Sequence, residues 1–152
     1  MLIAVVVITG VLLLLNLVIG PGFAQFRAEL AFNLFRNDFE QAAQGRDIKP
    51  FGVLDVISHD AQEFLIANYQ TGYIRKGLDF QTSIWGFGSQ TTYFGIVYAA
   101  EDLPLGFQCV DQPLVPDEEG WYWSEEQVNG HGDNWQRIMK LDDHWYYYEM
   151  HF

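Results

Sequence analysis

The sequence predicts an α+β protein, in which an N-terminal transmembrane helix and one amphipathic helix precede a bent antiparallel β-sheet, a meander of about 6–8 strands. Three observations favour this fold class. The first twenty residues, Met1 to Gly20, carry no charged side chain, the following segment is apolar at helical spacing, and the chain after Pro50 alternates with a period of two. The predicted domains are 1–22 as the anchor, 23–45 as the amphipathic helix and 46–152 as the β domain.

The uncharged N-terminal run is long enough to cross a bilayer, because twenty residues at about 1.5 Å each make a helix of roughly 30 Å. A cleaved signal is the alternative, with Gly22 and Ala24 before the cut, but no basic residue precedes Arg27 and the apolar run is too long. We therefore expect a retained, single-pass anchor in the cell membrane. Arg27 and Arg36 would place the domain in the cytoplasm, whereas a signal-like start before a compact Trp- and Tyr-rich domain favours an extracytoplasmic position, which we adopt.

The segment from Gln25 to Gln44 is predicted to be one amphipathic helix that ends near Gly45. Its core-facing arc contains Ala28, Ala31, Phe32, Phe35, Phe39, Ala42 and Ala43. A second apolar ridge, formed by Phe26, Leu30 and Leu34, is interpreted as either further core or a membrane-proximal contact.

The rest of the chain is predicted to form short strands separated by turns. A first hairpin is expected from 51–58 and 64–69 around a turn at 59–61, and a second from 78–87 and 91–99. The loop at 111–120 contains two prolines and a cluster of acids. Further strands are expected at 105–110, 121–123, 135–141 and 144–152.

The formal charge of −12 is concentrated in residues 101–152, which hold twelve acidic and two basic residues. This field repels phosphate backbones and anionic lipid headgroups, so nucleic acid is excluded as a partner, while cationic partners stay open. A single cysteine, Cys109, excludes an intrachain disulfide.

Aromatic residues dominate the last thirty-two positions, and Trp121 and Trp123 share one face of their predicted strand. Such rings either bind sugars and partner proteins or pack against neighbouring strands of the sheet. The predicted ligand-binding residues are Trp121, Trp123, Trp135, Asp133 and His144.

The sequence contains no recognisable metal-binding, catalytic or nucleotide-binding motif. His131, Asp133, His144, Glu149 and His151 lack the spacing of a metal site, since adjacent strand positions point to opposite faces. There is no G-x-S-x-G and no G-x-G-x-x-G motif. We predict no catalytic residue, no metal and no cofactor, and we expect the protein not to be an enzyme.

The C-terminal segment DNWQRIMKLDDHWYYYEMHF resembles the ends of small single-pass bacterial membrane proteins that join one N-terminal helix to a Trp- and Tyr-rich β domain. The resemblance implies a membrane anchor and an outward-facing domain, and it implies no activity. The function we expect is a membrane-anchored, non-catalytic binding domain for a protein, a peptide or an envelope glycan. The alternatives are an accessory subunit of a membrane complex and a cell-envelope hydrolase.

Overall fold

The computed structural model describes residues 8–11, 20–44, 59–67, 74–104 and 113–152. Within these ranges no helix is both long enough and apolar enough to cross a membrane. Most of the predicted anchor at 1–22 lies outside the described residues, so membrane anchoring stays a prediction.

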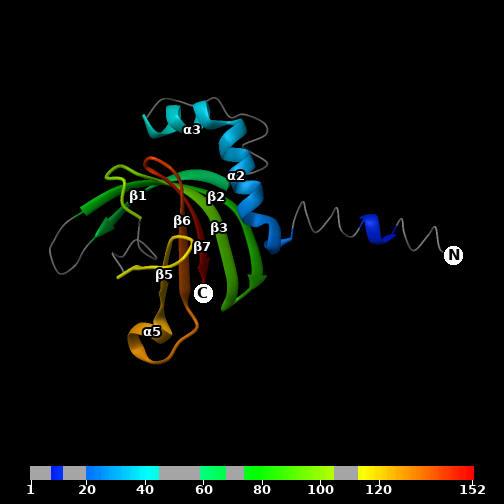
Figure 1. The fold of residues 1–152 in the computed structure, drawn as a ribbon, viewed down its shortest axis with the longest axis vertical. Helices are drawn as coiled ribbons and strands as arrows, with labels where there is room; N and C mark the ends of the chain where they lie inside the picture. Colours follow the sequence, from blue (N-terminus) through cyan, green and yellow to red (C-terminus); the bar gives the residue numbers. More distant parts are fainter. Residues whose placement is uncertain (1–7, 12–19, 45–58, 68–73, 105–112) are drawn as a thin grey trace.

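In the described part of the chain, seven antiparallel strands form one strongly curved sheet in the order β1-β2-β3-β7-β6-β5-β4 (Figure 1). Their bounds are β1 His59–Ala67, β2 Ile74–Phe87, β3 Gln90–Ala99, β4 Val115–Pro116, β5 Trp121–Ser124, β6 Trp135–Asp142 and β7 Trp145–His151. The α+β class and the antiparallel sheet are therefore confirmed. The order is not a simple meander, because the C-terminal strand β7 lies between β3 and β6.

Strand β7 occupies the centre of the sheet because it is apolar on both faces. Its residues Trp145 to Tyr148 are all buried, although their side chains alternate between the two faces. A strand of this kind leaves the least apolar surface exposed to water when it has a neighbouring strand on each side and packed side chains on each face of the sheet.

The β2–β3 hairpin agrees with the prediction, since Phe87 pairs with Gln90 around a two-residue turn at Gly88 and Ser89. The predicted turn at 59–61 is wrong, because these residues begin strand β1, which pairs with β2. The predicted strands at 51–58 and 105–110 lie outside the described residues.

The predicted amphipathic helix is broken into two, α2 (Ala24–Leu34) and α3 (Arg36–Ala43), after a short 3-10 turn η1 (Pro21–Phe23). The break is at Phe35, whose φ of −117° and ψ of 23° leave the helical region. A further short helix, α5 (Glu125–Asn129), was not predicted; the Ser124 hydroxyl caps it by accepting a hydrogen bond from the Gln127 amide at 3.3 Å.

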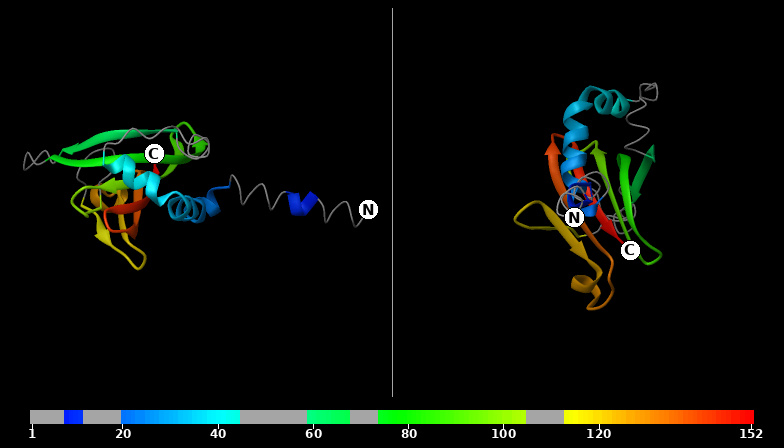
Figure 2. Two further views of the ribbon diagram at one scale, coloured as in Figure 1. Left: turned by 90° about the horizontal axis from the view of Figure 1, so that it is seen from above. Right: turned by 90° about the vertical axis from the view of Figure 1, so that its right-hand side faces the viewer.

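Helices α2 and α3 pack on one face of the sheet through the predicted apolar arc (Figures 1 and 2). Phe32 lies 5.4 Å from Trp145, and Phe39 lies 4.9 Å from Phe80, ring centre to ring centre. The second ridge of α2 is exposed, so its interpretation as core is wrong. The opposite face of the sheet has its own buried cluster, which contains Val97, Ala99, Ile138, Tyr146 and Tyr148.

Candidate functional site

The three predicted tryptophans lie on opposite faces of the sheet. Trp121 pairs with Ile138, and Trp123 with Gln136, so both lie on the face that bears the Val97–Tyr148 cluster. Trp123 is only 6% exposed, and Trp121 packs edge-on against Tyr146 at 5.9 Å. These two rings therefore contribute to packing, and Trp135 faces the helix side of the sheet.

The other two predicted residues lie apart from each other. Asp133 is exposed before β6, where its carboxylate accepts a hydrogen bond from Gln90 Nε2 at 3.2 Å. His144 lies in the turn between β6 and β7, at the opposite end of both strands, with a φ of 67°. The five predicted residues consequently do not form one site, and Trp135 is the one around which other functional groups gather.

Trp135 is the middle ring of a row that crosses three strands. Its indole lies nearly parallel to the His151 ring at 5.7 Å and 13°, and to the Tyr122 ring at 6.5 Å and 27°. Because its two partners belong to the strands on either side of β6, the three rings form a continuous aromatic wall.

Beside this wall is an open cleft of about 380 Å³, lined by Asp117, Tyr122, Trp135, Arg137 and Glu149. Strand register explains the lining, since Tyr122 pairs with Arg137, and Arg137 pairs with Glu149. Residues paired in this way point to the same face. The cleft is therefore built by β5, β6 and β7 and by the loop that precedes β5.

Hydrogen bonds within the protein hold the polar groups of the cleft in place. Asp117 Oδ1 accepts from the backbone amides of Glu119 at 3.0 Å and Gly120 at 2.7 Å. Glu149 accepts from the Tyr147 hydroxyl at 3.0 Å, and Arg137 forms an ion pair with Glu119. Asp117 and Glu149 thus contribute two carboxylates to the cleft and Arg137 one guanidinium, whose charge is offset by its ion pair with Glu119, so the cleft carries an excess of negative charge.

The buried Tyr147 hydroxyl is a neutral donor to Glu149, which lines the cleft. Burial, together with the nearby negative charge of Glu149, raises the pKa of Tyr147 well above its ordinary value. The phenol therefore stays protonated and keeps its hydrogen bond to Glu149, which orients that carboxylate.

A hydroxyl–imidazole pair adjoins the aromatic row, with Thr92 Oγ1 2.9 Å from His151 Nδ1. A nucleophile of this kind also needs an acid that orients the imidazole and donors that stabilise an oxyanion. The hydrogen bonds of the described residues include no carboxylate bonded to His151. Among the described residues, no three His, Cys, Asp or Glu side chains lie close enough together to bind a metal ion.

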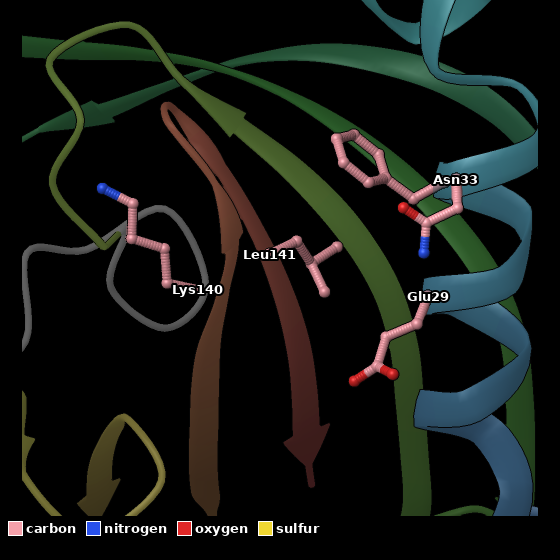
Figure 3. A pocket seen from close by; sticks show the side chains of 5 residues that line it. Glu29, Asn33, Lys140 and Leu141 are labelled. Carbon is pink, nitrogen blue, oxygen red and sulfur yellow. The ribbon is translucent and has the colours of Figure 1, made fainter.

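A second, smaller cavity of about 220 Å³ lies between α2 and β6, lined by Glu29, Phe32, Asn33, Lys140 and Leu141. Figure 3 shows the Lys140 side chain directed away from Glu29 and Asn33. The Lys140 ammonium instead donates to Asp102 Oδ2 at 2.7 Å. This cavity therefore lacks a cation facing its carboxylate, and it is the weaker candidate.

Comparison of the chain with protein-family models, with curated proteins and with solved structures finds no match in any of the three. The class defined by the fold and the site is an α+β protein with two helices on a curved sheet and an aromatic, acidic cleft on β5, β6 and β7.

Proposed function

We propose that the protein is a membrane-anchored, non-catalytic binding domain whose cleft beside Trp135 binds a cationic peptide segment. The observation that carries the proposal is the composition of the cleft, which combines an aromatic wall with two carboxylates and with a guanidinium that is itself paired with Glu119. Lysine and arginine side chains bind to aromatic faces and to carboxylates at the same time.

The charge of the chain supports a cationic ligand over a neutral glycan. Residues 101–152, which include all five residues that line the cleft, have a net charge of −10. A field of this sign raises the association rate of a positively charged partner. A neutral sugar gains nothing from this field.

The membrane location that we propose for the domain rests on the apolar, uncharged run from Met1 to Gly20. The domain is held on the extracytoplasmic side of the cell membrane by a single-pass anchor. A topology reporter fused after Phe152 tests the side, and activity of an exported reporter is the expected result.

Binding is tested with the full chain in nanodiscs and a fluorescein-labelled octapeptide of alternating lysine and alanine. The peptide with glutamate in place of lysine is the comparison. We expect anisotropy to rise only with the lysine peptide, and affinity to fall as salt increases. Equal binding of both peptides contradicts the proposal, and binding of a trimer of N-acetylglucosamine in their place favours the glycan alternative.

A substitution in the cleft, compared with a matched substitution elsewhere, tests whether the peptide binds in the cleft. Glu149→Gln removes one charge from the cleft and is expected to weaken binding by roughly fivefold to tenfold. Asp143→Asn removes one charge from a side chain that is 87% exposed in the turn at the other end of β6, and is expected to leave binding unchanged. Equal effects of the two substitutions would show that only overall charge matters.

A further inference from the structure

Helix α2 carries an apolar stripe that the sheet does not cover. Phe26, Leu30 and Leu34 recur every fourth residue, and Phe23 precedes them in η1. All four are exposed, Leu30 to 46% and Leu34 to 67%. The buried face of the same helix is made by Ala24, Ala28, Ala31 and Phe32, so α2 is apolar on two separate faces.

The end of the β2–β3 hairpin carries a second exposed apolar group, consisting of Ile84, Trp85 and Phe87. Phe87 is 94% exposed, which is rare for a phenylalanine in a folded domain. The hairpin ends on the same side of the molecule as the start of α2 (Figures 1 and 2). Both groups therefore lie exposed on one side of the molecule, and we call them together the α2–hairpin surface.

The α2 part of this surface directly follows the uncharged N-terminal run, and this position indicates which surroundings the surface contacts. The uncharged run ends at Gly20, only three residues before Phe23. The end of the run is fixed on α2, because Arg27 Nη1 donates to the Gly20 carbonyl at 2.7 Å and the Phe23 amide lies 3.4 Å from the same oxygen. Whatever surrounds the end of the run therefore also meets the start of α2.

The charge distribution agrees with contact to lipid. No charged residue occurs between Asp79 and Glu101, although the chain carries −12 overall. Helices α2 and α3 together contain Arg27 and Arg36 against three acids, close to neutrality. This side of the molecule thus escapes the repulsion that keeps the acidic half away from headgroups.

We infer that the α2–hairpin surface lies in the interface of the bilayer and holds the domain against the membrane beside its anchor. Aromatic and aliphatic side chains on such a surface insert between headgroups, and Trp85 is of the residue type that prefers this depth. The inference rests on the membrane anchoring of the proposed function. It adds a second contact, which sets the orientation of the domain and of its cleft relative to the bilayer.

The test uses the full chain in phosphatidylcholine nanodiscs, with Cys109→Ser and one new cysteine labelled with a nitrobenzoxadiazole dye. Leu30→Cys and Phe87→Cys report on the surface. Val128→Cys in α5 is the matched control, because Val128 is apolar and 53% exposed on another element. All three substitutions replace exposed side chains and leave the core intact.

We expect quenching by nitroxide-labelled lipid to be at least about twofold stronger at positions 30 and 87 than at position 128, with the reverse order for aqueous iodide. Equal iodide quenching at all three positions overturns the inference and leaves the anchor standing. Shielding of positions 30 and 87 from both quenchers also overturns it, and points to a second copy or to a subunit of a membrane complex. A chain that does not co-purify with nanodiscs overturns the anchoring proposal itself, and this inference with it.

Discussion

Asp79 of β2 is a hydrogen-bond partner of Tyr148, which lies two strands away, and both face away from the helices. The ring crosses Gly95 of β3 so closely that a Cβ added there would lie 2.5 Å from Tyr148 Cζ and Oη. Tyr148 thereby reaches Asp79 with a hydrogen bond. Asp79 Oδ1 is buried with no partner within the part of the chain that the structure describes. Burial raises the pKa of Asp79 from 3.8 to about 6, against the opposing effect of the Tyr148 hydrogen bond.

This raised pKa makes the protein less stable as the pH rises. Between pH 3.8 and about 6 the folded state binds a proton that the unfolded state has lost, so the free energy of unfolding falls across this window. A difference of about two pKa units corresponds to about 3 kcal/mol. Asp79→Asn keeps the shape and removes the charge. We therefore expect it to be up to about 3 kcal/mol more stable than the wild type at pH 8 and nearly equal to it at pH 4.

The assay is urea unfolding of the full chain in micelles, followed by tryptophan fluorescence from pH 4 to 8. Glu118→Gln, which neutralises an exposed acid, serves as the control, and its difference from the wild type should not change with pH. If Asp79→Asn differs from the wild type by the same amount at pH 4 and pH 8, burial does not set the pKa of Asp79 and the reasoning is refuted.

Three further substitutions test the packing and are measured by urea or thermal unfolding. Gly95→Ala should cost roughly 1–3 kcal/mol, and clearly less in a Tyr148→Ala background where the clash is absent. Asp102→Ala removes the carboxylate that accepts hydrogen bonds from the Lys140 ammonium and from the His144 amide in the β6–β7 turn, and it should lower the melting temperature. The pKa of Asp102 is lowered to about 2, chiefly by its hydrogen bond from Lys140, so its contribution is complete above about pH 4 and is lost as the pH falls toward 2. Phe32→Ala in the helix–sheet core should cost about 3–5 kcal/mol.

Local sequence patterns predicted the elements well where the apolar spacing is regular. The core-facing arc of 25–44 packs as expected, and the strands at 121–123 and 135–141 match β5 and β6. The break at Phe35 was missed because its ring packs against the same cluster as the rest of the arc, so the spacing continues through it. Helix α5 was missed because its five residues are too short for a periodic signal.

The candidate site was predicted only in part, because strand register decides it. Trp135 was identified from its residue type, whereas its neighbours Tyr122, Arg137 and Glu149 come from three different strands. Period-two alternation places Trp135 and Arg137 on one face, but it does not tell which residues of β5 and β7 stand opposite them. The central position of β7 also required long-range pairing with β3, which no local pattern shows.

The most direct test of the proposed cleft measures the indole N–H chemical shifts of the ¹⁵N-labelled full chain as the lysine–alanine octapeptide is added, and asks which indole responds. The chain has five tryptophans, and each gives its own indole N–H resonance. We predict that the Trp135 resonance shifts in a saturable manner, while those of Trp121 and Trp123, on the opposite face, stay in place. A saturable shift of Trp121 or Trp123 with Trp135 unmoved would place the ligand on the other face of the sheet and contradict the account.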